Sequence, residues 1–131
     1  MQISSEIKNI RIASAEVIDY IKKAKANISK NILFDIKLCV EEAIRNAILH
    51  GSKSNAKLPV EISYVIEMDR IKITILDKGN GFNVNDLPDP TNMKNLYKES
   101  GRGVYIIRRL MDSVKYNEKG NCVTMEKKLE G

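Results

Sequence analysis

The chain has 131 residues, of which 43% are hydrophobic and 30% charged, and it carries a net charge of +5. This composition is typical of a globular protein long enough to bury a core, so we expect a single domain over residues 1–131. No apolar run approaches the ~20 residues that cross a membrane. The modest positive charge suits an anionic ligand or an acidic protein partner, and the dispersed basic residues with few aromatics argue against direct nucleic-acid binding.

The two cysteines, Cys39 and Cys122, lie far apart in the sequence, and His50 is the single histidine. This spacing argues against a thiolate or imidazole metal site, and it favours two small buried side chains in a reducing cytoplasm.

The first half of the chain predicts one short strand and two helices. Residues 2–12 alternate weakly in hydrophobicity, which indicates an edge strand, and Ser14 is a candidate N-cap for a helix that ends near Lys25. A second helix is predicted from about residue 31 to 49, with an apolar face toward the core. Glu42 and Asn46 lie one turn apart at the border of that face, and Gly51 is a candidate C-cap.

The second half predicts two hairpins separated by a loop and a helix. Residues 60–66 and 71–77 each alternate in hydrophobicity, which is the pattern of two paired, half-buried strands. Residues 83–100 contain two prolines and no clear period, which favours a lid or binding loop. A third helix follows over residues 103–112, and a closing hairpin over 114–129. This order predicts an α+β fold, a two-layer sandwich with a mostly antiparallel sheet and its helices on one face.

Three motifs carry chemistry, and each has a plain structural alternative. Asp77 ends a strand and could accept a hydrogen bond from an adenine amine, while Gly79 and Gly81 would let the backbone approach a flat base. A glycine-rich turn would look the same. Gly101-Arg102-Gly103 opens a helix, where free N–H groups and the helix dipole favour phosphate, although an ordinary loop-to-helix junction is also compatible.

The third motif is the pair Glu42 and Asn46. An amide oxygen can serve Mg²⁺ on a nucleotide, which takes only one or two protein ligands, and a carboxylate one turn away can accept a proton. Taken alone, this pair is better explained as two polar residues at the edge of an amphipathic helix. The order of all three motifs along one chain favours a single nucleotide site over three separate coincidences.

The motifs resemble the three boxes of the GHKL ATPase superfamily, which shares the Bergerat nucleotide-binding fold. Residues 42–51 resemble its N box, residues 77–82 its G1 box and residues 100–107 its G2 box. Residues 46–51 and 103–112 are particularly similar to the bacterial anti-sigma factor serine-protein kinases of the RsbW and SpoIIAB type. The resemblance covers nearly the whole chain.

The resemblance implies a role for each matching residue. Glu42 would be the catalytic base and Asn46 the Mg²⁺ ligand. The family usually has Gly-Thr after the final turn, whereas this chain has Gly120-Asn121, so the amide of Asn121 would take over the water-mediated contact with adenine. The complete set of residues implied to bind the nucleotide is Asn46, Asp77, Gly79, Gly81, Phe82, Gly101, Arg102, Gly103, Val104 and Asn121.

The implied function is that of a cytoplasmic, homodimeric anti-sigma factor. It would bind a sigma factor and use ATP and Mg²⁺ to phosphorylate a serine of an anti-anti-sigma protein of the STAS-domain class. Its first helix would hold much of the sigma-binding surface, with Arg11 as a candidate contact. An alternative is a regulator in which ATP only switches partners without efficient phosphoryl transfer. An ATPase module of a histidine kinase or topoisomerase is a third alternative, which the lack of a phosphoacceptor helix pair and a transducer domain disfavours.

Overall fold

The computed structural model describes residues 1–51, 55, 57–79 and 99–130. Gly81, Phe82 and nearly all of the predicted lid over residues 83–100 lie outside this range.

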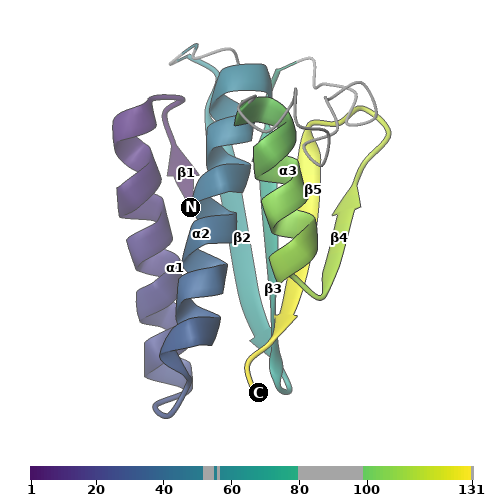
Figure 1. Ribbon diagram of the computed structural model, residues 1–131. Coiled ribbons are helices and arrows are strands. Elements are labelled where there is room, and N and C mark those ends of the chain that lie inside the picture. The colour runs from purple at the N-terminus through teal and green to yellow at the C-terminus, as the bar shows by residue number, and fades with distance from the viewer. Residues whose placement is uncertain (52–54, 56, 80–98, 131) are drawn as a thin grey trace.

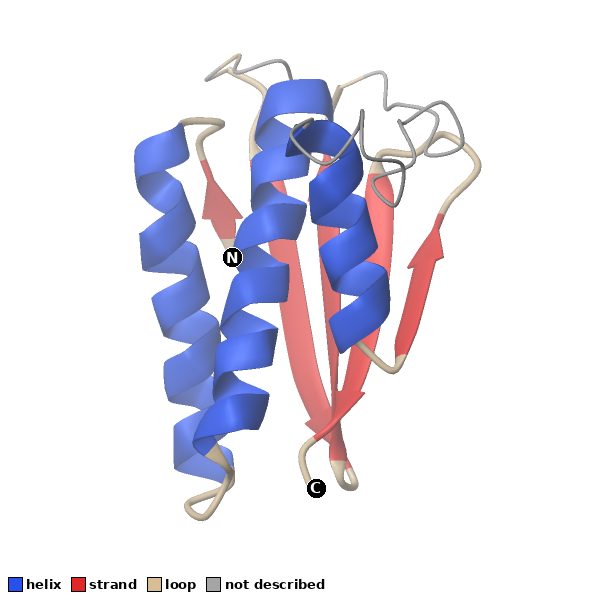
Figure 2. Ribbon diagram, viewed as in Figure 1, coloured by secondary structure: helices blue, strands red, loops and turns tan. Residues whose placement is uncertain are grey.

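The described residues form two layers, a sheet and a group of helices that covers one of its faces (Figures 1 and 2). The sheet has five antiparallel strands in the order β1-β2-β3-β5-β4. The strands are β1 (Gln2–Ile3), β2 (Val60–Glu67), β3 (Arg70–Asp77), β4 (Ser113–Tyr116) and β5 (Cys122–Lys128), and the helices are α1 (Ile10–Ala24), α2 (Lys30–Asn46) and α3 (Glu99–Leu110). The predicted α+β sandwich is therefore confirmed.

The central strand β3 packs one face against the helices and contributes that face to the core. Its alternating isoleucines, Ile71, Ile73 and Ile75, are buried against the helices, as period-2 patterning requires. The hairpin register pairs Glu67 with Arg70 at the turn and Val60 with Asp77 at the far end. This register places Asp77 at the same end of the sheet as the turn between β4 and β5.

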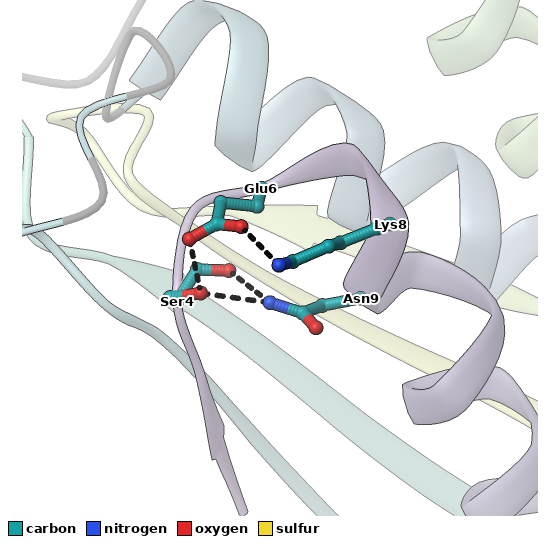
Figure 3. Close-up of polar contacts among 4 residues, drawn as sticks. All are labelled: Ser4, Glu6, Lys8 and Asn9. Atoms are coloured by element: carbon teal, nitrogen blue, oxygen red, sulfur yellow. Dashed lines mark hydrogen bonds and ion pairs between the residues drawn. The ribbon is translucent and has the colours of Figure 1, made fainter.

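The N-terminal segment differs from its prediction. The strand ends after Ile3, a 3₁₀ turn follows over η1 (Ile7–Asn9), and α1 begins at Ile10. The side-chain amide of Asn9 donates to the backbone oxygen of Ser4 at 3.1 Å and to its Oγ at 2.8 Å, which closes the chain into this turn (Figure 3). The alternation over residues 2–12 did not reflect burial, since Ile7 and Ile12 are both exposed.

Ser14 was predicted as an N-cap but lies inside α1, fully buried. Its hydroxyl donates to Oε2 of Glu41 at 2.6 Å, so it joins α1 to α2 instead of starting a helix. Ser29 is the cap that the structure shows, because its Oγ accepts from the backbone N–H of Ile32 at the start of α2.

The C-terminal end of α2 also departs from expectation. The helix widens into a π-helical turn, η2 (Ala47–Gly51), and Gly51 does not adopt the left-handed conformation of a C-cap glycine. Glycine is required there instead because the carboxylate of Asp77 occupies the space of a side chain.

Helix α3 begins at Glu99, four residues earlier than predicted, so the Gly101-Arg102-Gly103 segment lies within its opening turns. Its other end is anchored by Lys127, whose Nζ donates to the backbone oxygen of Leu110 at 2.6 Å and lies 3.9 Å from the carboxylate of Asp35. A cation at the C-terminal end of a helix also complements the helix dipole. Among the helices described, none is long and apolar enough to span a membrane.

Candidate functional site

A small pocket lies between the C-terminal half of α2, the end of β3 and the turn between β4 and β5. Asn46, Asp77, Tyr116 and Asn121 supply its polar side chains, and small or aliphatic residues of α2 and the sheet supply the rest. Its cavity volume is about 10 Å³, which is room for roughly one water molecule. A purine base would therefore enter only if the walls of the pocket moved apart.

Asp77 is the buried carboxylate of this pocket, with 2% of its surface exposed. One carboxylate oxygen, Oδ1, accepts a hydrogen bond from the backbone N–H of Gly79 at 2.9 Å. Burial raises the pKa of Asp77 above its ordinary value of 3.8, while the Gly79 hydrogen bond and the charge of Lys119 act in the opposite direction. A desolvated carboxylate with spare lone pairs is a strong acceptor for an amine N–H.

Gly51 lies directly against this carboxylate. A Cβ built on Gly51 would stand 2.2 Å from Oδ2 of Asp77 and 2.6 Å from Oδ1. No side chain fits in that space, so Gly51 is required by the position of Asp77, and the two residues lock the π-helical turn against the end of β3. Sequence patterning gave Gly51 only a capping role.

Asn121 fastens the other side of Asp77. Its backbone oxygen accepts from the N–H of Asp77 at 2.9 Å, and its side-chain nitrogen donates to the backbone oxygen of Asp77 at 3.2 Å. Asn117 holds Asn121 in turn, with side-chain contacts at 2.6 and 3.0 Å. Asn121 thus ties the β4–β5 turn to the end of β3, and its water-mediated contact with a base stays a prediction.

Glu42 and Asn46 form a second group beside the pocket, facing α3. A Cβ built on Gly103 would lie 2.8 Å from Oε2 of Glu42 and 3.2 Å from the amide nitrogen of Asn46. The absence of a side chain at Gly103 therefore lets the opening turns of α3 pack against both residues. Glu42, Asn46 and the glycine segment, which the sequence predicted to belong to one site, therefore lie next to one another.

Asn46 bears on whether this group suits a metal-bound nucleotide. Its side chain is 5% exposed, and its amide nitrogen has no hydrogen-bond partner within the described part of the chain. An unpaired amide costs free energy when buried, and which end of the amide faces the cavity is fixed only by its partners. The residue therefore fits a role in which its amide oxygen turns to a cation carried by a bound ligand.

The remaining predicted residues are distributed as follows. Arg102 is exposed and Val104 is buried, both within α3, while Gly79 is buried beside Asp77. The N–H of Gly101 is among the first of α3, which lack intrahelical partners in any α-helix and can bind an anion. Gly81 and Phe82 lie outside the described residues.

Sequence reasoning missed Tyr116 as well as Gly51. Tyr116 ends β4 and lines the pocket, and the guanidinium of Arg108 lies 5.8 Å from the centre of its ring. Burial raises the pKa of Tyr116 to about 12. The alternation along residues 114–116 was the available signal, because it places Val114 and Tyr116 on the same face of the strand.

A sandwich of this topology, with a buried aspartate at the end of a central strand and a Glu–Asn helix facing a glycine-rich helix start, defines an ATP-binding domain of the GHKL type. The chain belongs to the histidine kinase-like ATPase domain family, whose model matches residues 3–127.

Known proteins extend this assignment. The chain is 31% identical over 142 residues to the serine-protein kinase RsbW of Staphylococcus aureus strains MSSA476 and JH9, with 97% of this chain and 89% of each relative covered. Among solved structures, it resembles the histidine kinase domain of the blue-light activated histidine kinase from Erythrobacter litoralis EL346, with a TM-score of 0.58 and 18% identity. That match covers 92% of this chain and 61% of the other, and it supports the fold alone.

Proposed function

We propose that the protein is an anti-sigma regulatory factor with ATP-dependent serine-protein kinase activity. It binds a sigma factor, and it phosphorylates a serine of an anti-anti-sigma protein of the STAS-domain class. The observation that carries this proposal is the convergence of Glu42 and Asn46 on Gly103, beside the pocket of Asp77. The 31% identity to RsbW over 97% of the chain supports the choice of kinase class.

The residues divide the work between binding and proton transfer. The buried carboxylate of Asp77 accepts a hydrogen bond from the adenine amine, and the first N–H groups of α3 hold the phosphates. The amide oxygen of Asn46 would hold Mg²⁺, which would neutralise charge at the phosphates when bound. Glu42 takes the proton of the attacking serine hydroxyl while the Oγ of that serine bonds to the γ-phosphorus of ATP. The bond between the γ-phosphorus and the β–γ bridging oxygen breaks at the same time, and ADP is released.

The replacement Glu42→Gln tests the catalytic step. It keeps the shape of the side chain and removes the proton acceptor, so serine phosphorylation should fall by a factor of about 10² to 10⁴ while Mg-ATP affinity stays within a few fold. Glu41→Gln is the matched control, because Glu41 is the neighbouring carboxylate and is hydrogen-bonded to Ser14, away from Gly103. Labelled ATP and a purified STAS-domain partner provide the assay. Full transfer by the Glu42→Gln protein would remove Glu42 from this role.

A regulator that binds ATP without efficient transfer is the second candidate. Glu42 does not line the pocket of Asp77 and Asn121, so nucleotide binding there does not require the proposed base. Wild-type protein that binds Mg-ATP and exchanges partners, but transfers no phosphate to any serine of those partners, would establish this alternative.

The proposal includes a homodimer that acts in the cytoplasm. Light scattering of the purified chain at several concentrations measures the assembly, and a mass of about 30 kDa, twice the 14.8 kDa of one chain, is expected.

A further inference from the structure

A second recess lies far from the nucleotide pocket, between α1 and α2 near the turn that joins them. Its volume is about 720 Å³, and Ile18, Leu33 and Phe34 provide much of its apolar lining. Phe34 is 64% exposed, which is unusual for an aromatic side chain on a helix. Figure 1 shows this turn at the end of the helical layer opposite to the start of α3. We call this recess the α1–α2 groove.

Positive charge is concentrated around the α1–α2 groove. Residues 22–37 contain five lysines and one aspartate, a net charge of +4 out of the +5 of the whole chain. Three lysines, Lys22, Lys30 and Lys37, line the groove itself together with one acidic residue, Asp19, so its lining carries a net charge of +2. The one aspartate in this segment, Asp35, lies 3.9 Å from Lys127 of β5. Within the described residues no ion pair neutralises the three groove lysines.

We propose that the α1–α2 groove is a docking site for an acidic amphipathic helix of a partner protein. An aliphatic floor with an exposed aromatic residue accepts apolar side chains spaced at i, i+4 and i+7 of a helix. The lysine rim attracts glutamate and aspartate on the flanks of that helix and speeds its association.

Other occupants fit the groove less well. A second copy of this chain would bring the same excess of lysine against it, and like charges oppose such a contact. Nucleic acid would use the lysines but not the aliphatic floor. A flat lipid surface would leave a concave floor unfilled. The groove shares no lining residue with the nucleotide pocket, so this proposal does not depend on the proposed kinase activity.

The experiment uses a displayed library of amphipathic helices with acidic, neutral or basic flanks, selected on the immobilised full chain. Acidic helices with apolar residues at i, i+4 and i+7 should be enriched. The affinities of enriched peptides are then measured by fluorescence anisotropy on the wild type, on Phe34→Ala and on the double variant Lys22→Glu/Lys37→Glu. Each groove variant should weaken binding by about tenfold or more, as truncation of an interface anchor does.

Matched controls separate the groove from general charge and exposure. Met68→Ala removes an apolar side chain that is 93% exposed on the β2–β3 turn. Lys72→Glu/Lys115→Glu makes the same change in net charge with two exposed lysines of β3 and β4, on the sheet. Both controls should bind the peptides within about twofold of wild type, and Phe34→Ala should bind Mg-ATP normally.

Several results would overturn the proposal. One is a selection without enrichment of acidic helices, and another is an equal loss of affinity in the groove variants and the controls. Anionic phosphatidylserine vesicles or a short RNA that bound with the same sensitivity to Phe34→Ala would assign the groove to a membrane or a nucleic acid. Self-association abolished by Phe34→Ala, measured by sedimentation, would assign it to a second copy of the chain.

Discussion

At the scale of single residues, the site depends on two places where a glycine admits a neighbouring polar group. Gly51 leaves space for the carboxylate of Asp77, and Gly103 leaves space for Glu42 and Asn46. Neither glycine is needed for a left-handed backbone conformation. Their common property is that the volume of a methyl group is already occupied by the polar atoms that the proposed function uses.

Gly51→Ala should disturb both folding and nucleotide binding, because the new methyl group would overlap Asp77. We expect a loss of about 1–3 kcal/mol of folding free energy, the usual cost of overpacking, and a Mg-ATP affinity lower by about tenfold. Urea denaturation and calorimetry measure the two effects. In an Asp77→Ala background the clash is removed, so the same substitution should cost much less stability. An equal cost in both backgrounds would contradict the assigned contact.

The raised pKa of Asp77 predicts a pH dependence of stability. Burial favours the protonated form in the folded state, so the folded protein binds this proton more tightly than the unfolded chain does. The stability that Asp77 contributes is therefore greatest at low pH and falls as pH rises from about 3.8 through the raised pKa. Denaturation of wild type and of Asp77→Asn across pH 3.5–7 isolates this term, since asparagine does not titrate. A difference that instead grew in favour of wild type with rising pH would mean that hydrogen bonding outweighs burial.

At the scale of elements, α1 and α2 are joined by the hydrogen bond between Ser14 and Glu41 at 2.6 Å. Ser14→Ala should cost about 1.5–3 kcal/mol, because a buried hydroxyl bonded to a carboxylate is lost. Ser63→Ala, on an exposed position of β2, is the control and should change stability by less than about 0.5 kcal/mol. The two roles of Ser14 can also be distinguished. A bond between α1 and α2 should survive in the wild type when the first turn of α1 frays, whereas an N-cap bond would be lost with that turn. Hydrogen exchange of the α1 amides measures that fraying.

The sequence correctly predicted the elements whose hydrophobic pattern follows from which of their faces is buried. Alternation identified β2 and β3 because one face of each lies on the core, and the helical wheel placed Glu42 beside Asn46 for the same reason. The errors fall where tertiary contacts decide. Strand β1 ends after Ile3, Ser14 lies inside a helix, and Gly51 owes its identity to Asp77, a residue 26 positions later in the chain. No local period reports such distant contacts.

At the scale of the whole molecule, the two ends of the helical layer are assigned to different ligands. The end near the start of α3 holds the pocket of Asp77 and Asn46, whereas the end near the α1–α2 turn holds the basic groove. The core between them is continuous and draws on α1, α2, α3 and the sheet. A ligand that binds only the folded state at either end therefore stabilises the same cooperative unit.

Thermal unfolding with and without metal tests this arrangement through the nucleotide end. At 100 times its dissociation constant, Mg-ATP should stabilise the protein by about 2.7 kcal/mol, which raises Tm by roughly 10 °C for a domain of this size. Chelation of Mg²⁺ with EDTA should remove most of that rise in wild type. Asn46→Ala should show a small rise that EDTA hardly changes, because the buried amide proposed to hold the cation is gone. Phe34→Ala should keep the full metal-dependent rise, since Phe34 lies in the groove and not in the pocket. If Asn46→Ala responded to EDTA as strongly as wild type does, the cation would have to be held elsewhere, and the role given to Asn46 would fail while the pocket of Asp77 remained.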